Sequence, residues 1–582
     1  MRERRDFAGD LRLRIVGVAA ALGLLSSGAA WLLLHLIRFF TNLFFYQSWS
    51  DAERSPALNT LGLWVIIVPV LGGLVVGLIA RFGSEKVRGH GIPEAIEAIL
   101  FGQSKMSPKV AVLKPLTSGI AIGSGGPFGA EGPIIMTGGA IGSLIAQYLH
   151  LTGAERKTLL VAGAVAGMTA VFGTPVAAVL LAIELLLFEL RPRSLLPVAL
   201  ACAVAGFART LLLDAGPLFP LQTLAPSLPV LAGCVAAGVI AGATAWLMSA
   251  SLYKLEDWFG KLPVHWMWWP AIGALAVGVG GYFQPRALGV GYDVIGDLLH
   301  NQLALGVMLA LLGCKALMWV IALASGTSGG VLAPLLMLGA GMGALLAPFM
   351  PGNDPALWPL VFMAATLGGM MRAPVMAAIF ALELTGDVNA LLPLLAASAL
   401  AYGITVLTMR RSILTEKIAR RGYHIYREYG IDPLERHSVA ELMSEAVETI
   451  AADELLGAVL DKRFGAAQTH RAFPVLRDGA LLGMADREAL LQGRAQRAAR
   501  SMAEVFGANQ PLVAFPHETA RAIASRLAVN GLERLPVVAD ASSMRLVGII
   551  SRSDLIKPSR AVFDEEEKRE LFRRPPFTGV AP

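Results

Sequence analysis

The chain has 582 residues, of which 55% are hydrophobic and 16% charged, and its net charge is +6 at pH 7. This composition indicates an integral membrane protein with room for more than one domain. Lys and Arg do not gather on a polar face with interleaved aromatic residues, which excludes a nucleic-acid-binding surface. Cys202, Cys234 and Cys314 lie in apolar segments without metal-ligand spacing or a disulfide framework.

The first predicted element is an apolar helix from Ile15 to about Phe45. A signal peptide has a shorter apolar core and a small-residue cleavage site, so this segment is not one. At about 1.5 Å per residue the helix is ~45 Å long and must be tilted in a bilayer. Basic residues flank the apolar region: Arg2, Arg4, Arg5, Arg12, Arg14, Arg410, Arg411, Arg420 and Arg421. We therefore expect a protein of the cell (inner) membrane with both termini in the cytoplasm.

Residues 15–408 continue as a succession of apolar segments, many of them interrupted by Gly or Pro. Several are shorter than the about 20 residues that a simple spanning helix needs. Transporters and channels use short, broken helices to bring backbone amides to the middle of the membrane. The expected fold is therefore an all-α polytopic membrane protein of broken and tilted helices.

An internal repeat organises this region. Residues 113–146 align without gaps with 314–347, so that Lys114 pairs with Lys315. The flanking segments repeat in the same order, with 89–100 matching 289–299 and 167–185 matching 368–384. We place the two halves at roughly 60–215 and 226–422 and expect them to meet at a site in the middle of the membrane.

Within the first half, the stretch from 123 to 143 carries one carboxylate, Glu131, followed by Gly132 and Pro133. Proline is favoured in the first turn of a helix, so a helix is expected to start at Glu131 with its free amides and positive dipole end exposed. Such helix ends bind anions. A carboxylate and a small anion accept from the same amides, so protonation of Glu131 would release its place to the anion.

After Arg410 the composition becomes that of a soluble protein, and 437–558 shows the pattern strand, helix, strand, turn, strand, helix twice. The chain is accordingly divided into a cytoplasmic segment at 1–14, a membrane domain at 15–422, a linker at 423–436, two α/β domains at 437–492 and 501–558, and a tail at 559–582. The tail is expected to be poorly ordered, as chain ends without an apolar pattern usually are.

Three pentapeptides carry a family resemblance: GHGIP at 89–93, GAEGP at 129–133 and GVLAP at 330–334. In this order and spacing they resemble the anion-binding signatures of the CLC family of chloride channels and proton/chloride exchangers, and 437–558 resembles that family's CBS-domain pair. The resemblance covers nearly the whole chain. It implies two inverted repeats, a homodimer in the lipid bilayer, and an independent pathway for chloride or another small monovalent anion in each subunit.

The resemblance also implies which residues form the pathway. A central anion is expected at the amides of 331–332, and a second site on the extracellular side at the amides of 130–132. Glu131 matches the family's gating glutamate, whose carboxylate competes with the anion for that second site. The implied anion-binding positions are His90, Gly91, Ile92, Ala130, Glu131, Gly132, Val331, Leu332 and Leu414.

The chain departs from the family pattern at the central site. His90 stands where relatives carry Ser or another small residue, and it either donates an N–H to the anion or swings away and leaves the amides to act alone. Leu414 replaces a Tyr whose hydroxyl contacts the anion in many relatives, and Leu332 replaces the usual Phe. The central site is therefore expected to be less polar in side chains and weaker or less selective.

Another departure concerns protons. The inner glutamate of the family's exchangers falls on Leu185, which cannot carry a proton. The neighbouring Glu184 points about 100° away on a helix, and its repeat mate Glu383 favours a structural role for both over a proton relay. The sequence thus favours passive conduction, with proton-coupled antiport as the alternative.

In the second CBS domain, Ser551 and Asp554 fit the family pattern for contacting the phosphates and ribose of an adenine nucleotide. Asp486 and Ala489 stand at the equivalent positions of the first domain, which therefore looks degenerate. A structural dimerisation module is favoured over nucleotide regulation, and no cofactor is expected to be required. A membrane-anchored adenine-nucleotide sensor is a remote alternative, since anchoring needs no broken helices.

An enzyme is not expected. The GYD at 291–293 and TGD at 385–387 superficially suggest an intramembrane aspartyl protease, but the second lacks the required preceding Gly, and both aspartates fall at segment ends. The chain contains no HExxH, and no metal-binding set is expected.

Overall fold

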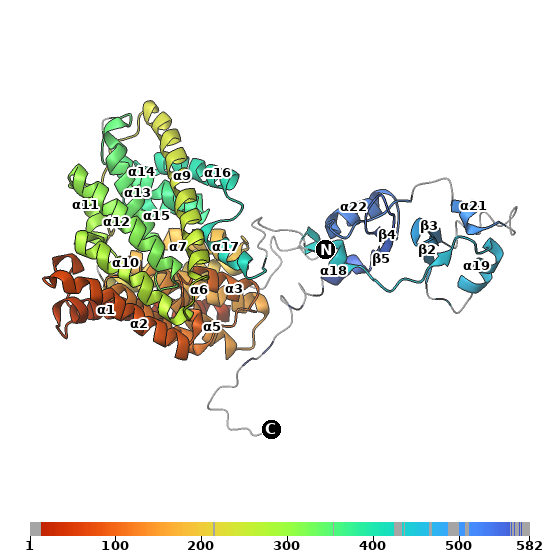
Figure 1. The fold of residues 1–582 in the computed structure, drawn as a ribbon, viewed down its shortest axis with the longest axis horizontal. Helices are drawn as coiled ribbons and strands as arrows, with labels where there is room; N and C mark the ends of the chain where they lie inside the picture. The colour runs from red at the N-terminus through yellow and green to blue at the C-terminus, as the bar shows by residue number, and fades with distance from the viewer. Residues whose placement is uncertain are drawn as a thin grey trace, which may run out of the picture. The chain divides into compact units, whose positions relative to one another are not determined.

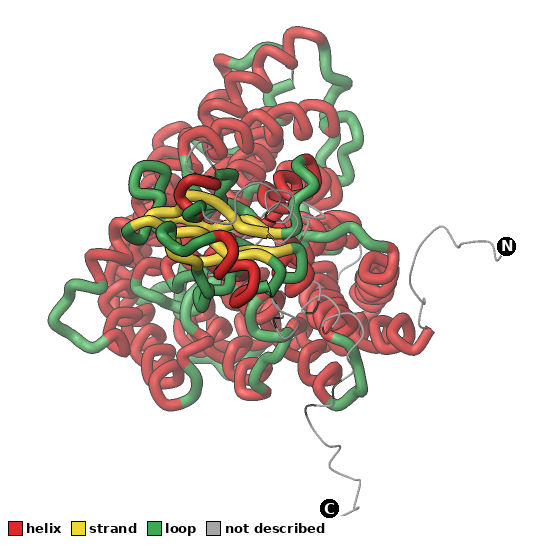
Figure 2. The backbone as a smooth tube through the Cα atoms, turned by 90° about the vertical axis from the view of Figure 1, so that its right-hand side faces the viewer, coloured by secondary structure: helices red, strands yellow, loops and turns green. Residues whose placement is uncertain are grey.

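The structure is a computed structural model that describes residues 13–213, 216–352, 354–423, 433–435, 437–464, 468, 470–486, 490, 500–506, 511–558, 560, 564, 570 and 572. The chain forms two compact units, the first comprising Met1–Tyr429 with Arg569–Pro582 and the second Gly430–Lys568. Figures 1 and 2 show the first unit as helices and loops and the second as a smaller α/β unit that carries the strands.

Within the described residues, the first half of the helical unit contains eight α-helices. They are α1 (Leu13–Tyr46), α2 (Ile67–Phe82), α3 (Ile92–Leu100), α4 (Pro108–Gly123), α5 (Glu131–Gln147), α6 (Gly153–Phe172), α7 (Pro175–Leu181) and α8 (Pro192–Leu212). Several begin with Pro in the first turn, where its missing N–H has no helical partner to lose. The expected helix start at Glu131 is where the structure has it.

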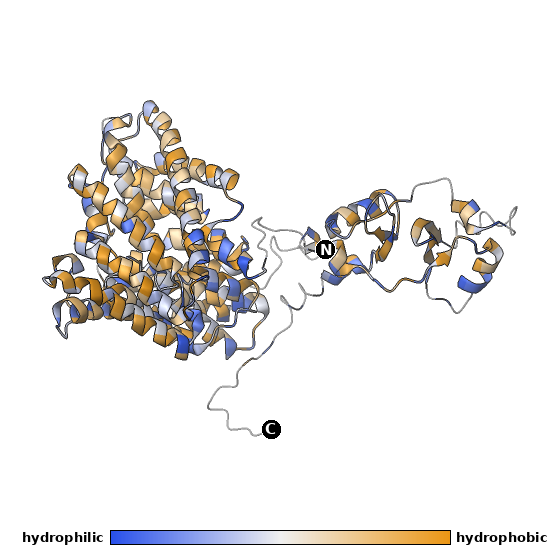
Figure 3. Ribbon diagram, in the orientation of Figure 1, coloured by the Kyte–Doolittle hydropathy of each residue, from blue (hydrophilic) through white to orange (hydrophobic). Residues whose placement is uncertain are grey.

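The residues that the structure describes in the second half form nine. They are α9 (Leu228–Phe259), α10 (Trp269–Phe283), α11 (Tyr292–Leu299), α12 (Leu305–Ala324), α13 (Leu332–Leu346), α14 (Leu357–Met371), α15 (Pro374–Thr385), α16 (Leu391–Thr408) and α17 (Ile413–Arg420). Among the described residues, seven helices are long and apolar enough to cross a membrane, and α1, with 34 residues, is the expected long first helix. Figure 3 shows apolar residues along the helices throughout this unit, as a lipid environment demands.

The repeat is visible in the packing of the helices. In the first half α1 packs against α4, α6 and α8, and in the second α9 packs against α12, α14 and α16. Each long helix thus contacts the equivalent members of its own half. This correspondence favours a first half that begins with α1, earlier than the boundary at residue 60 that sequence matching suggested.

The described part of the second unit forms a three-stranded and a two-stranded sheet, and Figure 2 shows their strands in yellow. In the first, β1 (Ile450–Ala451) pairs parallel with β2 (Ala472–Arg477), which pairs antiparallel with β3 (Ala480–Asp486). In the second, β4 (Arg534–Val538) pairs antiparallel with β5 (Leu546–Ser551). The α-helices described in this unit are α18 (Val439–Leu442), α19 (Leu456–Arg463), α21 (Met502–Phe506) and α22 (Ala520–Val529).

In each core of this unit, the segment that precedes one domain in the sequence packs against the strands of the other domain. Val439 packs in the core built on β4 and β5, and its N–H donates to Glu518 O at 2.9 Å. Met502 packs in the core built on β1–β3, and its N–H donates to Glu454 O at 2.9 Å. Neither core is therefore a continuous stretch such as 437–492 or 501–558, because each draws on a segment that lies next to the other domain in the sequence.

Two described residues of the C-terminal tail, Glu570 and Phe572, contact the first unit, while most of the tail, for which poor order is expected, lies outside the described residues. Glu570 N donates to Leu151 O at 3.2 Å. The ring of Phe572 lies between two cations, with Lys105 Nζ at 3.4 Å and Arg156 Cζ at 4.4 Å from its centroid. Cation–π contacts of this kind stabilise by about 0.5–2 kcal/mol, so Glu570 and Phe572 are held against the segments that carry Lys105, Leu151 and Arg156.

Candidate functional site: converging helix ends

The GAEGP and GVLAP loops pair with each other through their backbones. Gly129 and Gly330 form an antiparallel bridge, in which Gly330 N donates to Gly129 O at 2.9 Å and Gly129 N donates to Gly330 O at 3.3 Å. The helices α5 and α13 begin immediately after this bridge. The two repeat halves therefore meet where the sequence analysis placed the site, with two positive helix ends side by side.

Glycine is required at this meeting point because side chains would fill it. A Cβ on Gly129 or Gly330 would collide with the carboxylate of Glu131, and a Cβ on Gly132 would collide with His90 O. The last contact also shows that the GHGIP loop, just before α3, reaches the start of α5. All three signature loops are thus brought together.

The Glu131 carboxylate is fully buried and lies on the start of the opposite helix. Its Oε1 accepts hydrogen bonds from Leu332 N, the first residue of α13, and from Ala333 N at 3.4 Å. The family resemblance implies instead that the carboxylate competes for the amides of 130–132, at its own helix start. The Gly129–Gly330 bridge explains the difference, because it brings the free first-turn amides of α13 within reach of the side chain.

A buried lysine holds each repeat's loop in place. Lys114 Nζ donates to Val87 O at 2.9 Å, to Gly89 O at 2.8 Å and to Ser328 Oγ at 3.0 Å, which fixes the backbone just before His90. Lys315 does the same in the second half, donating to carbonyls of 287–290. Sequence matching paired the two lysines without giving them a role, although a Lys inside an apolar segment is itself a signal of function.

His90 is buried, and its Nδ1 has no hydrogen-bond partner among the described residues. Gly91, with φ of 89°, caps the start of α3 at Ile92, so that the first-turn amides of α3 point towards the converging loops. Leu414 is fully buried in the first turn of α17, which packs on α3 and α14. A residue that the sequence analysis missed supports this turn: the hydroxyl of Tyr253, on α9, donates to Ile413 O.

The glutamates near the proton position cap helices of the opposite half. Glu184 Oε2 accepts from Met376 N, in the first turn of α15, at 3.1 Å. Reciprocally, Glu383 accepts from Val176 N at 3.0 Å and Ala177 N at 2.8 Å, in the first turn of α7. Each carboxylate thereby satisfies amides that a helix start leaves open, which supports the structural role favoured for both. Leu185 is fully buried beside Glu184.

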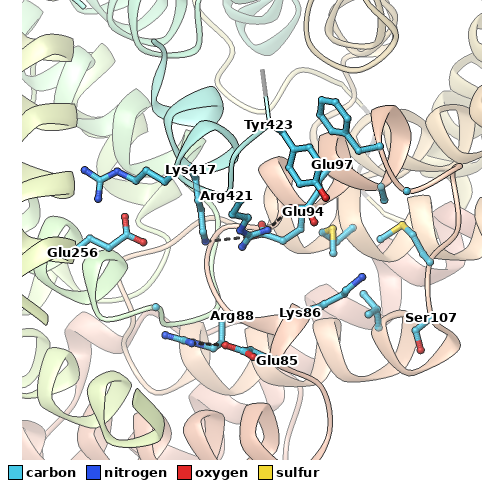
Figure 4. Close-up of a pocket in the computed structure, with 18 of the residues that line it drawn as sticks. Glu85, Lys86, Arg88, Glu94, Glu97, Ser107, Glu256, Lys417, Arg421 and Tyr423 are labelled. Carbon is cyan, nitrogen blue, oxygen red and sulfur yellow. Dashed lines mark hydrogen bonds and ion pairs between the residues drawn. The ribbon is translucent and has the colours of Figure 1, made fainter. Parts of the chain in front are cut away.

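A cavity of about 640 Å³ lies between the α3–α4 segment and α17 (Figure 4). Its lining includes six basic side chains and four acidic ones: Lys86, Arg88, Lys105, Lys417, Arg420 and Arg421, with Glu85, Glu94, Glu97 and Glu256. Glu94 is the best buried of the four acids and pairs with Lys417 at 3.0 Å and Arg421 at 3.1 Å. The basic excess favours entry of anions, and Met136 of α5 links the cavity wall to the Glu131 helix.

In the second CBS-like core, the positions expected to contact nucleotide bond to each other. Asp554 accepts from Ser551 N at 2.8 Å and Ser551 Oγ at 2.6 Å, and its other oxygen pairs with Lys557 Nζ at 2.7 Å. Asp486 ends β3 in the first core, while Ala489 lies outside the described residues. The described part of the chain holds no group of three or more His, Cys, Asp or Glu suited to a metal ion.

The Asp554 contacts predict a pH-dependent contribution to stability. Burial acts to raise the pKa of this carboxyl, but the bonds from Lys557 and Ser551 outweigh it and hold the pKa below its usual value. Asp554→Ala should therefore destabilise the second unit by about 1–2 kcal/mol at pH 7. The difference should shrink as pH falls below about 4, because the stabilisation is present above the unfolded pKa and lost through the lower folded pKa.

Tryptophan fluorescence would report on the helical unit, where all the tryptophans lie. Hydrogen exchange at the β5 amides of the full chain is therefore the measurement that follows the stability of the second unit. Asp461→Ala, an exposed acid on α19, serves as the control and should change protection little. Equal losses of protection for the two variants at pH 7 would contradict the assigned role of Asp554.

Comparison with known proteins agrees with this geometry. Residues 71–406 match the family model described as Voltage gated chloride channel, and residues 504–560 match the CBS domain model. The Voltage-gated ClC-type chloride channel ClcB of Citrobacter koseri is 29% identical over 399 residues, which are 66% of this chain and 93% of that protein. Its namesake in Escherichia coli is 28% identical over 417 residues, 70% of this chain and 97% of that protein.

Solved structures show the same fold. A slow cyanobacterial Cl−/H+ antiporter matches with a TM-score of 0.63 and 20% identity, over 72% of this chain and 99% of that one. A eukaryotic CLC transporter matches with a TM-score of 0.62 and 20% identity, over 93% of this chain and 98% of that one. The expected fold class, an all-α membrane domain followed by α/β CBS structure, is confirmed. Because the family model covers more than half of its length, the chain belongs to the voltage gated chloride channel, or CLC, family of chloride transport proteins and carries C-terminal CBS structure.

Proposed function

We propose that the helical unit conducts chloride, or another small monovalent anion, through a pathway gated by Glu131. The observation that carries this proposal is the Glu131 carboxylate on Leu332 N and Ala333 N. Those first-turn amides form an anion site at a positive helix end. The side chain of the gate therefore stands where the transported anion has to bind.

Gating follows from competition for these amides. An ionised Glu131 accepts their hydrogen bonds as chloride would, so the two exclude each other. A protonated carboxyl is a weaker acceptor and gives up the amides to the anion. The central anion would then contact Val331 and Leu332, with His90, Gly91, Ile92 and Leu414 around it, and the second would contact the amides of Ala130, Glu131 and Gly132.

Conduction is proposed to be passive. Leu185 cannot carry a proton from the inner side, and the carboxylate of Glu184 already caps α15. The alternative is proton-coupled antiport, the activity named for the cyanobacterial structural neighbour. That activity would need another group, or water, to bring protons to Glu131.

Purified protein in chloride-loaded liposomes separates the two, with chloride efflux and proton uptake recorded together. We expect chloride efflux without stoichiometric proton uptake, because no carboxylate stands at the inner proton position. Uphill proton pumping at a fixed ratio to chloride would show an antiporter instead. Absence of chloride flux at any pH would contradict anion conduction altogether.

We further propose a homodimer in the cell membrane with both termini in the cytoplasm, as the basic flanks of the membrane region predict. The second unit is proposed to act as a cytoplasmic CBS module that stabilises the dimer. Binding of an adenine nucleotide at Ser551 and Asp554 is the secondary proposal for this unit. It would require Asp554 to give up Ser551 or Lys557 as a partner.

A further inference from the structure

Arg88, the residue just before the GHGIP loop, contacts the second repeat half. Its guanidinium carbon lies over the ring of Trp266, 4.4 Å from the centroid, and over that of Trp269 at 5.7 Å. The two tryptophans belong to the short 3-10 turn Trp266–Trp268 and to the first residue of α10. A planar guanidinium stacks on aromatic faces, whereas a lysine ammonium acts as a point charge. The contact therefore depends on arginine itself.

The two tryptophans form a platform that is held by its own contacts. Trp269 Nε1 donates to Val264 O at 3.2 Å, and the 3-10 turn is capped by His265, whose Nδ1 accepts from Met267 N at 3.2 Å. The turn lies directly on α2, since a Cβ on Gly77 would come within 2.1 Å of Met267 O. The stacked guanidinium is thus held from outside the GHGIP loop.

The guanidinium also reaches the segment that leads to the GVLAP loop. A Cβ on Gly326 would lie 3.0 Å from Arg88 Nη2, so the group rests on this glycine. Gly326 follows the end of α12, where the negative helix end favours a cation. Beside this contact, Gly89 N donates to Gly326 O at 3.2 Å. Arg88 therefore links the start of one signature loop to the segment just before another.

Arg88 lines the cavity together with Trp269 and Gly326, but it is not a free cation there. Its Nη1 pairs with Glu85 at 3.0 Å (Figure 4), and its side chain is only 19% exposed. Its Nε is buried and has no hydrogen-bond partner among the described residues. Because a close ion pair presents little net charge at a distance, the shape and contacts of Arg88 matter more than its charge.

The equivalent position of the second half carries no cation. Matching Gly89 with Gly289 pairs Arg88 with Leu288, a buried core residue. In both halves a buried lysine donates to the two carbonyls that flank this position. Apolar packing of Leu288 completes the hold on the second loop. In the first half the loop borders the cavity, and the aromatic stack of Arg88 takes that place.

We propose that Arg88 is a positioning residue of the anion pathway. Stacked on Trp266 and Trp269, it holds the GHGIP loop so that the first-turn amides of α3 point at the transported anion. It acts through the backbone of the loop and makes no contact with the anion. When the stack is lost, the loop has to be ordered as the anion binds, which weakens binding. The proposal rests on the proposed anion conduction and deepens it by naming a residue that sets its affinity.

The test measures chloride binding by the full-length protein with Arg88→Gln and, separately, with Trp266→Leu. Each change removes the stack, so the Kd for chloride should rise about fivefold in either variant. The two changes together should raise the Kd no further than one alone, because they remove the same contact. In liposomes the chloride concentration at half-maximal flux should rise by a similar factor, with a smaller change in maximal flux.

Conservative variants separate positioning from charge. Arg88→Lys keeps the charge and loses the planar stack, so its Kd should be as high as that of Arg88→Gln. Trp266→Phe keeps an aromatic face and should restore most of the affinity. A normal Kd in Arg88→Lys would overturn the proposal, since charge alone would then account for the effect.

Lys86→Gln is the matched control, because Lys86 is an exposed cation in the lining of the same cavity. Its Kd for chloride should stay within about twofold of that of the unmodified protein. Additive increases in the double variant, or an unchanged Kd in Arg88→Gln, would overturn the role of Arg88 alone. Absence of chloride flux in the unmodified protein would instead overturn the proposed function.

Hydrogen exchange at the GHGIP loop gives a second reading that does not depend on chloride affinity. After correction for intrinsic rates, the Gly89 amide should exchange at least about fivefold faster in Arg88→Gln, because its bond to Gly326 O lies beside the stack. Lys86→Gln should leave this exchange unchanged. Equal protection of Gly89 in Arg88→Gln and in the unmodified protein would contradict the positioning role, whatever the Kd.

Discussion

Replacing Glu131 by alanine is expected to raise chloride efflux from proteoliposomes at neutral pH by at least about tenfold. The carboxylate holds Leu332 N and Ala333 N, and charge-assisted bonds of this kind are worth about 1.5–3 kcal/mol, or a factor of ten or more. Removing the side chain leaves these amides to the anion. Efflux should be measured from pH 5 to pH 8.

The pH dependence identifies the mechanism. In the unmodified protein efflux should rise as pH falls, because a protonated carboxyl gives up the amides. Both Glu131→Ala and Glu131→Gln should lose this dependence, since neither side chain titrates. Glu97→Gln, a half-buried acid in the lining of the cavity, is the matched control and should keep it. A pH profile that persists in Glu131→Gln would refute Glu131 as the gate.

The position of Glu131 at a helix start could be predicted from local sequence. Pro133 and the preceding glycines fix where α5 begins, and a first-turn proline constrains the backbone whatever surrounds it. The choice of amides that the carboxylate occupies could not be predicted in this way. It depends on the Gly129–Gly330 bridge, which joins residues some 200 positions apart, and a local pattern carries no information about such pairing.

The second unit shows the same limit. The strands and helices of 437–558 could be predicted because the alternation of apolar and polar residues and the helical period are local properties of the sequence. The sequence does not show that Val439 packs in the core of β4 and β5 and Met502 in the core of β1–β3. Both segments are apolar, so either could pack in either core. Tyr253 was missed for a related reason: a tyrosine in an apolar helix resembles an ordinary core residue until its hydroxyl is seen to meet Ile413 O.

Replacing Lys114 by methionine is expected to be the most damaging single change outside the gate. Methionine fills much of the same volume but leaves Val87 O, Gly89 O and Ser328 Oγ without their buried donor. Each unpaired buried acceptor costs about 1–3 kcal/mol, although Ser328 keeps Ser118 as a partner at 2.9 Å. A loss of about 3 kcal/mol and a clearly lower melting temperature by tryptophan fluorescence are expected.

The same substitution should weaken anion binding beyond its effect on stability, because the carbonyl at Gly89 lies next to the His90–Ile92 loop that ends at the start of α3. A freed loop no longer aims the first-turn amides of α3 at the central site, so the Kd for chloride should rise at least about tenfold, in line with the importance of preorganised donors. Lys109→Met tests whether loss of positive charge alone is responsible, since Lys109 is an exposed lysine in the first turn of the same helix. It should leave melting temperature and Kd nearly unchanged. If both lysine variants instead weaken chloride binding equally without a change in melting temperature, Lys114 acts through its long-range charge. That result would contradict the role assigned to its hydrogen bonds to the GHGIP loop.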